Sequence, residues 1–324
     1  MLVTGGAGYI GAHTCKALAA AGCKPIVVDN LALGKREAVR WGPLIVGDIA
    51  DGELIGDVMR RYDVDAVMHF AGLASVSESV SNPDLYYRNN VAGSISLLDA
   101  MRRAGVRSIV FSSTCAVYGA PARLPVGEDA PLAPINPYGS SKHIVEQALQ
   151  YESTAHGLRY AALRYFNAAG ADLEGMIGGC RSDSPQLIPR ALLAAAGESK
   201  QLEIYGDDYS TPDGTCIRDY IHVTDIARGH LHALDYLAEG GPSAAVNLGT
   251  GQGMSVLEVL ASVERITGRR LRTVKMPRRV GDPPVLIADT QTASRLFGFT
   301  AQYSDIDTIV GTAWRFRERT IGER

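Results

Sequence analysis

The chain has 324 residues, of which 46% are hydrophobic and 21% charged, and its formal net charge at pH 7 is −3. This composition is globular, the length suits one large or two joined domains, and the charge gives no reason to expect nucleic acid or a membrane surface as a partner. The first residues lack the pattern of a signal peptide and no apolar run reaches the roughly 18 residues of a membrane span, so we expect a cytoplasmic protein.

In the first half of the chain, short apolar runs alternate with amphipathic stretches. Strands are predicted at Met1–Thr4, Pro25–Asp29, Leu44–Val46, Ala66–His69, Ser108–Ser112 and Tyr160–Arg164, and helices at Gly8–Ala21, Leu54–Tyr62 and Asn89–Ala104. Because the strands are apolar on both sides, helices should cover both sheet faces. The sequence therefore predicts an α/β fold with a Rossmann-type, doubly wound parallel sheet.

After Asn167 the pattern becomes irregular. Gly170–Ser184 and Gly206–Gly214 have no apolar period and flank short helices and strands. We expect a smaller α+β lobe of residues 167–324, packed at the carboxyl edge of the sheet of residues 1–166. This lobe should be discontinuous, because residues 221–248 again read as a helix followed by a buried strand and so rejoin the first domain.

The first predicted strand runs into a Gly-x-x-Gly-x-x-Gly turn that opens a helix. Gly5 permits the tight turn, Gly8 lets the backbone approach a diphosphate, and Gly11 allows the helix to pack closely on the strand. Tyr9 and Ile10 lie at the helix start, where free N–H groups favour an anion. The motif predicts a dinucleotide site.

Asp29 ends the second predicted strand, where a carboxylate accepts hydrogen bonds from a ribose. A carboxylate there repels a 2′-phosphate, which favours NAD over NADP, although Lys35 and Arg36 follow on a loop, where they are either solvated or able to hold a phosphate. Asn30 comes next. Asp48 and Ile49 suit an adenine contact, and a helix cap is an equal alternative for Asp48.

Tyr138 and Lys142 are four residues apart at the start of a further predicted helix, so they share one face. A neighbouring ammonium, aided by the positive nicotinamide ring of a bound NAD, favours a phenolate, and we therefore expect the two to lower the pKa of Tyr138 and to make it a general base. Thr114 follows the fifth predicted strand, in the stretch Phe111–Gly119 that leaves the carboxyl end of the sheet facing the same cleft. Its hydroxyl is expected to bond to Tyr138 and to a substrate hydroxyl.

The five cysteines are odd in number and scattered, which favours reduced thiols over disulfides or a metal site; they are Cys15, Cys23, Cys115, Cys180 and Cys216. His230 and His232 are two apart on a predicted helix and point in different directions. No metal site is expected.

Taken together, these residues resemble the extended short-chain dehydrogenase/reductases, and within them the UDP-glucose 4-epimerases, over essentially the whole chain. The matching stretches are Thr4–Gly11, Asp29–Asn30, Gly47–Ile49, His69–Gly72, Asn89–Val91, Ser112–Gly119, Tyr138–Lys142, Leu163–Asn167, Arg218–Val223, Asn247–Gly249 and Pro277–Asp282. The resemblance implies a tightly bound NAD, a UDP-sugar substrate, a role in galactose metabolism and a homodimer.

The resemblance also assigns roles to single residues. Tyr138 is implied as the base, Lys142 as the contact of the nicotinamide ribose, and Thr114 as the replacement for the usual serine. On the cofactor side it adds Phe70, Ala71, Gly72, Asn90 and Tyr165. An aromatic residue at a strand end is as often core, so Tyr165 stays open between the two roles, and His69 reads best as a satisfied buried histidine.

On the substrate side the resemblance implies contacts with the UDP-sugar from residues of the C-terminal lobe. These are Asn167, Gln186, Leu187, Tyr205, Arg218, Arg279, Asp282 and Leu286. Two guanidinium groups suit a diphosphate. A local ion pair remains the alternative for Arg218, which is followed by an aspartate.

Cys115 and Ala116 favour epimerisation over dehydration. Dehydratases of this family carry an Asp-Glu pair directly after the threonine, and neither side chain here can act as a carboxylic acid or base. A 4-keto sugar formed at this site can only rotate and recover its hydride on the other face. A uronate epimerase or decarboxylase remains an alternative, and a non-catalytic NAD-sensing protein a weaker one.

Three positions depart from the best-known family pattern. Ala74 stands where a lysine can lie near the cofactor, Gln186 replaces an Asn or His, and Leu286 occupies a place that is aromatic in strict UDP-glucose enzymes. The smaller Leu286 leaves additional activity on UDP-N-acetylhexosamines open.

Overall fold

The computed structural model describes residues 1–179, 185–279 and 281–322 and is built around a seven-stranded parallel sheet. Its strands are β1 (Leu2–Thr4), β2 (Ile26–Asp29), β3 (Leu44–Val46), β4 (Val67–His69), β5 (Ser108–Thr114), β6 (Arg159–Tyr165) and β11 (Ala244–Leu248). They lie in the order β11-β6-β5-β4-β1-β2-β3. This arrangement confirms the predicted Rossmann-type fold.

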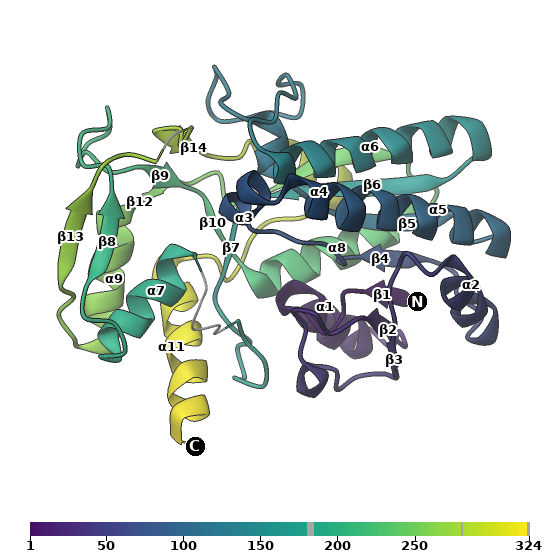
Figure 1. Cartoon of the computed structure of the whole chain (residues 1–324), viewed down its shortest axis with the longest axis horizontal. Coiled ribbons are helices and arrows are strands. Elements are labelled where there is room, and N and C mark those ends of the chain that lie inside the picture. Colours follow the sequence, from purple (N-terminus) through teal and green to yellow (C-terminus); the bar gives the residue numbers. More distant parts are fainter. Residues whose placement is uncertain (180–184, 280, 323–324) are drawn as a thin grey trace.

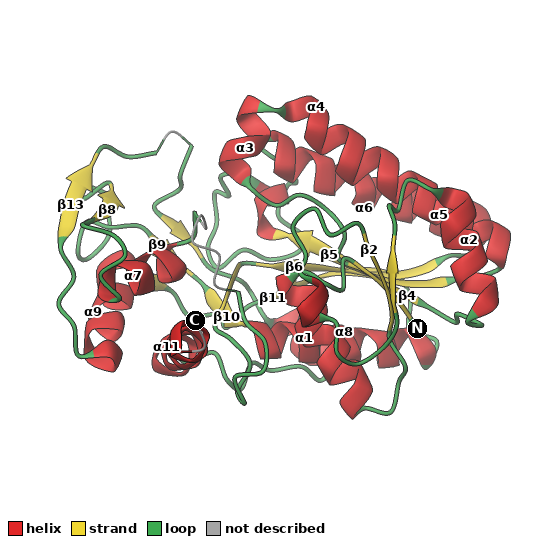
Figure 2. Cartoon of the chain, turned by 60° about the horizontal axis from the view of Figure 1, so that its bottom comes forward, coloured by secondary structure: helices red, strands yellow, loops and turns green. Residues whose placement is uncertain are grey.

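Helices cover both faces of this sheet, as Figure 2 shows. One face carries α2 (Gly52–Arg61), α5 (Gly93–Ala104) and α6 (Pro137–His156); the other carries α1 (Tyr9–Ala20), α8 (Val223–Ala238) and α10 (Gln291–Phe297). Successive strand residues point to opposite faces, so Leu2 packs in the first layer and Val3 in the second. Both layers are apolar, which explains the absence of polar alternation in the strands.

The helices α5 and α6 have clear local causes. Asn136 caps α6 by accepting a hydrogen bond from the Gly139 amide, Pro137 occupies its first turn, and Gly157 ends it in the left-handed conformation at φ +70°. The predicted helix Asn89–Ala104 is not uniform. Its beginning belongs to a π-helical turn, Tyr87–Ala92, which follows α3 (Val76–Ser81) and α4 (Pro83–Tyr86).

A second set of elements lies beyond the carboxyl edge of the sheet, on the left of Figure 1. Its strands are β7 (Asn167–Ala169), β8 (Leu202–Tyr205), β9 (Ile217–Arg218), β10 (Tyr220–His222), β12 (Met254–Ser255), β13 (Thr273–Met276) and β14 (Val285–Leu286). Its helices are α7 (Leu187–Ala195), α9 (Val256–Thr267) and α11 (Ile306–Gly322). These helices share one apolar core with strands β8 and β10.

The irregular stretches are found where the sequence predicts them. The segment Gly206–Gly214 forms turns between β8 and β9, and most of residues 170–179 lies outside regular structure. Residues 180–184, which include Cys180 and the end of the predicted stretch Gly170–Ser184, lie outside the described part of the chain, as does Val280. The four remaining cysteines are free thiols.

Candidate active site

The glycine turn lies where the strand order of the sheet reverses, between the neighbours β1 and β4. Gly5 has φ +71°, and a Cβ on it would lie 2.5 Å from the Ala71 amide nitrogen. A Cβ on Gly11 would lie 2.3 Å from the carbonyl oxygen of Gly5, whereas one on Gly8 would meet no atom closer than 3.2 Å. Two glycines are thus required by packing, and the third leaves the turn open at the place where α/β folds bind ligands.

Asp29 lies at the end of β2 and faces this turn. Its carboxylate accepts hydrogen bonds from the backbone N–H groups of Ala7 at 3.0 Å and Leu31 at 2.8 Å. It is buried, whereas Lys35 and Arg36 are exposed. The carboxylate is therefore fixed beside the glycine turn, in the position expected of a group that binds a ribose.

Asp48 and Asn30 form a small cluster after β3 and β2. Asn30 donates to the Asp48 carboxylate at 2.9 Å, and Asp48 also accepts from the Ala50 amide at 2.9 Å. Asp51, and not Asp48, is the residue that caps α2, so the helix-cap alternative for Asp48 is wrong. Ile49 is buried in the neighbouring core.

The segment after β4 is held by Asn90 of the π-helical turn. Asn90 accepts from the Leu73 amide at 2.8 Å and donates to the Leu73 carbonyl at 3.0 Å and to Ser141 at 3.0 Å. A Cβ on Gly72 would lie 3.4 Å from the Lys142 ammonium nitrogen. Gly72 therefore lies next to the start of α6, whereas the backbone of Phe70 and Ala71 lies against Gly5 and the Phe70 ring packs on His230 of α8.

Tyr138, Thr114 and Lys142 are brought together at the carboxyl end of β5. The Thr114 hydroxyl lies close enough to the Tyr138 phenol to lower its pKa, and it accepts from the Ala116 amide at 3.1 Å. Lys142 lies one turn further along α6 and donates to the Ser112 carbonyl at 3.0 Å. The prediction that β5 and the start of α6 face one site is confirmed in this geometry.

The expected direction of the Tyr138 pKa is wrong for the protein groups alone. Burial raises this pKa to about 12, and the hydrogen bond from Thr114 opposes the rise only in part. Burial also lowers the pKa of Lys142 to about 8. The spacing of the two residues was visible in the sequence, but the desolvation of both was not, and desolvation is the largest cause of each pKa shift.

Tyr165 belongs to the apolar core on the α8 side of the sheet. Its hydroxyl bonds to the Ser112 hydroxyl, and its ring lies 6.0 Å from that of His230. His69 is buried and bonds to Thr4 at 2.7 Å and Ser94 at 2.8 Å, which confirms it as a satisfied core histidine. Tyr165 is likewise a core residue by its contacts, although its hydroxyl lies beside the strand end that carries Thr114.

Arg218 and Asp282 form an ion pair in the C-terminal lobe. Arg218 is buried and also donates to the carbonyl of Ile217 at 2.7 Å. Its neighbour Asp219 instead accepts from the Thr250 amide at 2.9 Å, so the local alternative of an Arg218–Asp219 pair is wrong. Both expected substrate residues are therefore near one another.

Arg279 and Tyr205 form a second contact in this lobe. The Arg279 guanidinium lies over the Tyr205 ring at 4.0 Å from its centroid, and the Tyr205 hydroxyl donates to Glu203 at 2.6 Å. Leu286 of β14 pairs in register with Arg218 of β9. Five of the expected substrate residues thus form two groups within the lobe, one of Arg279 and Tyr205 and one of Arg218, Asp282 and Leu286.

Leu286 links the lobe to the end of β5. It is buried in a small apolar cluster with Cys115, Phe166 and Tyr118. Cys115 directly follows Thr114, and burial raises the pKa of its thiol to about 12. Leu286 therefore packs against the short helical turn Cys115–Tyr118 that directly follows Thr114.

The other expected substrate residues lie at the base of the lobe. Asn167 begins β7, Gln186 is exposed directly before α7, and Leu187 is the first residue of that helix. Ala74 is exposed in the loop after β4. A small enclosed space is lined by Tyr9, Gly170 and Gln186, which connects the glycine turn to this part of the lobe.

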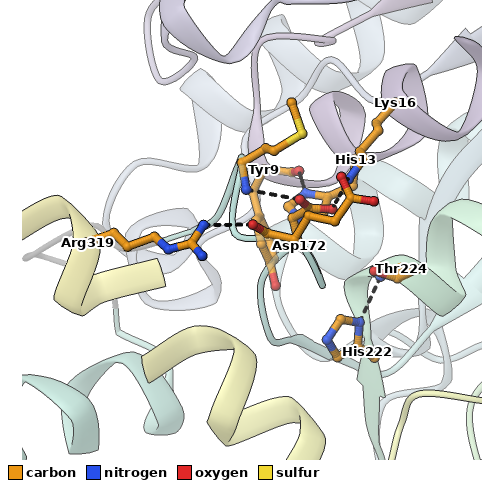
Figure 3. A network of polar contacts seen from close by, with 9 residues as sticks. Tyr9, His13, Lys16, Asp172, His222, Thr224 and Arg319 are labelled. Carbon is orange, nitrogen blue, oxygen red and sulfur yellow. Dashed lines mark hydrogen bonds and ion pairs between the residues drawn. The ribbon is translucent and has the colours of Figure 1, made fainter. Parts of the chain in front are cut away.

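Tyr9 also joins the two parts of the molecule directly. Its hydroxyl donates to the Gly170 carbonyl at 2.6 Å, and Lys16, two turns further along α1, pairs with Asp172 at 2.6 Å. Figure 3 shows these α1 side chains beside Asp172, with Arg319 reaching toward the same loop from α11. The sequence offered no signal for this network, because its members are separated by more than a hundred residues.

Neither a membrane helix nor a metal site is found among the described residues. None of their helices is long and apolar enough to cross a membrane. None of their His, Cys, Asp and Glu side chains gather in groups of three that could hold a metal ion.

Comparisons with known proteins agree with this geometry. Residues 1–249 match the model of the NAD dependent epimerase/dehydratase family. The chain is 48% identical over 319 residues to the UDP-glucose 4-epimerase of Rhizobium meliloti, covering 98% of this chain and 97% of that protein.

Solved structures are similarly close. The crystal structure of UDP-glucose 4-epimerase from Brucella ovis in complex with NAD has a TM-score of 0.95 and 54% identity and covers 97% of each chain. The UDP-Glc/GlcNAc 4-epimerase of Campylobacter jejuni has a TM-score of 0.87 and 39% identity and covers 98% of each chain. From its sequence, its fold and these relatives, the chain belongs to the NAD dependent epimerase/dehydratase family.

Proposed function

We propose that this chain is a UDP-glucose 4-epimerase that interconverts UDP-glucose and UDP-galactose with a tightly bound NAD. The observation that carries the proposal is that Thr114 and Tyr138 meet at the carboxyl edge of the sheet, with Lys142 one turn further along α6. The family membership and the names of the close relatives support it. This reaction would give the protein a role in galactose metabolism.

The residues around the glycine turn fit NAD. The turn is open at Gly8, the buried Asp29 carboxylate is fixed beside it, and α1 begins directly after Gly8, where a helix N-terminus favours an anion. The diphosphate would lie on the residues from Gly5 to Gly11, and the adenosine beside Asp29, Asn30, Asp48 and Ile49. When bound, NAD accepts the hydride of sugar C4 and returns it.

Near the nicotinamide, Phe70, Ala71, Gly72 and Asn90 would form one wall and Tyr165 another. Lys142 would hold the ribose.

Tyr138 would take the proton of the C4 hydroxyl, and Thr114 would hold that hydroxyl in place. The transfer requires the Tyr138 pKa to fall from about 12, and a positive charge brought next to the phenol has this effect. Cys115 and Ala116 provide no carboxylate that could catalyse elimination of water from the oxidised sugar. The 4-keto sugar can therefore only be reduced again. Tyr138 returns the proton after the sugar has rotated and presents its other face.

Residues of the C-terminal lobe would hold the UDP group. Arg218 and Arg279 supply guanidinium donors for the diphosphate, and Asn167 and Asp282 supply polar partners. An anionic diphosphate would compete with Asp282 for Arg218, since the two are paired.

Around these four residues, Gln186, Leu187, Tyr205 and Leu286 would complete the substrate contacts.

The direct test uses the purified full-length chain. Mass spectrometry and absorbance should show retained NAD, and incubation with UDP-galactose should yield UDP-glucose. A panel that adds UDP-glucuronate separates the epimerase from a uronate epimerase or decarboxylase. Retained NAD without turnover of any UDP-sugar would contradict the proposed activity and leave a non-catalytic NAD-binding protein.

Activity on UDP-N-acetylhexosamines is a finer part of the proposal. Leu286 is smaller than an aromatic residue and lies against the loop that follows Thr114. The Campylobacter jejuni relative is named for both UDP-Glc and UDP-GlcNAc. Turnover of UDP-galactose without any turnover of UDP-N-acetylglucosamine would dismiss this extension.

We also propose a division into an NAD-binding domain of residues 1–166, rejoined by about 221–248, and a discontinuous UDP-sugar-binding lobe within 167–324. The strand β11 is part of the large sheet and the helix α8 packs on one face of it. This supports the assignment of residues 221–248 to the NAD-binding domain. Limited proteolysis with and without UDP should cut first in the lobe if the two parts are separate units.

A cytoplasmic homodimer completes the proposal. Exposed apolar side chains lie along the outer helices α4, α5 and α6, at Leu85, Ile95 and Tyr151, and a second copy of the chain would cover them. Light scattering of wild-type protein and of a Tyr151→Glu variant tests this; a monomeric wild type would contradict it.

A further inference from the structure

Glu146 lies on the third turn of α6, on the same face as Tyr138 and Lys142. It is buried, and both carboxylate oxygens are used. One accepts from the Ser113 hydroxyl at 2.5 Å and from the Arg164 Nε at 2.9 Å, and the other accepts from Arg164 Nη2 at 2.6 Å. A buried carboxylate with this many charge-assisted bonds is a fixed group.

The partners of Glu146 stand directly before two residues of the site. Ser113 precedes Thr114 at the end of β5, and Arg164 precedes Tyr165 at the end of β6. One side chain of α6 therefore holds both strand ends against the helix that carries Tyr138. A structural ion pair elsewhere in the core would not have this placement.

Arg164 extends the connection to the far side of the site. It donates to the Tyr118 hydroxyl at 3.0 Å, and Tyr118 donates to Asn247 of β11 at 2.7 Å. The network thus runs from α6 through the end of the sheet to the loop that packs on Leu286.

The charge of Glu146 acts on Lys142. Burial lowers the Lys142 pKa to about 8, and the Coulomb attraction of Glu146 is the cause that opposes this. His69 of β4 also faces Lys142, but burial lowers its pKa to about 3, so it carries no charge at neutral pH.

The remaining neighbours of Lys142 include polar or aromatic groups. They are the Ser112 carbonyl and the Phe111 ring of β5, Asn90 across Gly72, Tyr138 on α6, and Tyr165 bonded to Ser112. Arg164 lies beyond Glu146, and its charge would disfavour the ammonium if Glu146 were neutral.

We propose that Glu146 is a positioning residue of the active site, whose carboxylate keeps Lys142 as an ammonium ion and ties the ends of β5 and β6 to α6. This inference rests on the proposed function for its activity readout only. The state of Lys142 can be followed without turnover.

The test compares three variants of the full chain with wild type. Glu146→Gln removes the charge and keeps a similar shape, but it leaves Arg164 buried without an anion. Glu146→Gln combined with Arg164→Gln makes the pair neutral and avoids that penalty. Ser113→Ala is the matched control, because it removes a hydrogen bond of the same carboxylate and no charge.

The titration of Lys142 is measured by NMR of ¹³C-labelled lysine, assigned with Lys142→Met. Lys142 should titrate at lower pH in both charge-removing variants and at the wild-type pH in Ser113→Ala. With UDP-galactose, the alkaline limb of the kcat profile should move to lower pH, and kcat at pH 8 should fall by about tenfold or more.

An unchanged Lys142 titration in the neutral-pair variant would overturn the proposal. A neutral-pair variant that fails to fold would do so too, because the charges would then serve folding and not the site. If wild type turns over no UDP-sugar, the proposed function fails, but the lysine titration still decides the role of Glu146.

Discussion

The hydroxyl of Thr114 faces the phenol of Tyr138 across the junction between β5 and α6, and it lowers the pKa of that phenol against the effect of burial. The two residues are close because β5 runs on to Thr114, two residues beyond its predicted end, and because Asn136 and Pro137 start α6 directly before Tyr138. The Ala116 amide donates to the same hydroxyl and orients it. The proposed proton transfer depends on these two side chains.

Tyr138→Phe should reduce kcat with UDP-galactose by at least about 10²-fold, since it removes the only atom of this side chain that can accept the proton of the C4 hydroxyl. NAD should remain bound. Tyr86→Phe is the matched control, because the Tyr86 ring packs edge-on at 6.4 Å from that of Tyr138 and its hydroxyl bonds elsewhere. Kinetics and the NAD content of each protein measure the effect; equal activity in Tyr138→Phe and wild type would remove Tyr138 from the mechanism.

Gly11→Ala should destabilise the glycine turn and cause loss of NAD. The new Cβ would lie 2.3 Å from a backbone oxygen, which no side-chain rotation can relieve. Gly311→Ala, on the open side of α11 with no atom within 4 Å, should be neutral or stabilise by up to about 1 kcal/mol. Thermal unfolding and bound NAD are compared in both variants. Full NAD content in a stable Gly11→Ala protein would show that the turn relaxes.

Leu286→Tyr should lower turnover of UDP-N-acetylglucosamine by about tenfold more than turnover of UDP-galactose. The larger ring would enter the cluster with Cys115 and Phe166 and narrow the space beside Thr114. Leu286→Met conserves volume and is the control. The ratio of kcat/KM for the two substrates is the measurement, and an equal fall for both would assign Leu286 to packing alone.

Stability should fall steeply as the pH drops from about 6.5 toward 4. Burial lowers the pKa of His13, His222 and His230 to about 4 and that of His69 to about 3. Their folded pKa values lie below the unfolded value, so this stability is present above about pH 6.5 and is lost as the pH falls.

Each buried histidine contributes up to about 1.4 kcal/mol per pH unit in that window. Urea unfolding at pH 7.5 and pH 5.5 measures the loss, and His230→Asn should reduce the slope. A free energy of unfolding that is constant across this range would contradict the neutral, buried state of these rings.

Much of the fold was predictable because its signals are local. Most strand residues are apolar, the glycine turn follows the first strand, and Asp29 ends the second, so the sheet and its ligand edge follow from short stretches. Tyr138 and Lys142 were paired correctly because helix geometry alone relates residues four apart.

What the sequence could not provide depends on contacts between distant residues. The partners of Arg218 and Glu146 lie far along the chain, so a local reading proposed Asp219 for Arg218 and passed over Glu146 altogether. The predicted direction of the Tyr138 pKa shift was wrong for the same reason, because burial is a property of the whole molecule. The signal for Glu146 was present, four residues after Lys142, but a glutamate in a helix is usually solvated.

The helix α6 faces two very different environments along its length. Tyr138 lies in its first turn, and Tyr151, about 20 Å further along the axis, is 72% exposed. Tyr138, the proposed general base, and the outer apolar surface at Tyr151 thus belong to one continuous helix. A partner that binds the outer end of α6 would also restrict the motion of its inner end. If that partner is a second copy of the chain, specific activity should decline on dilution.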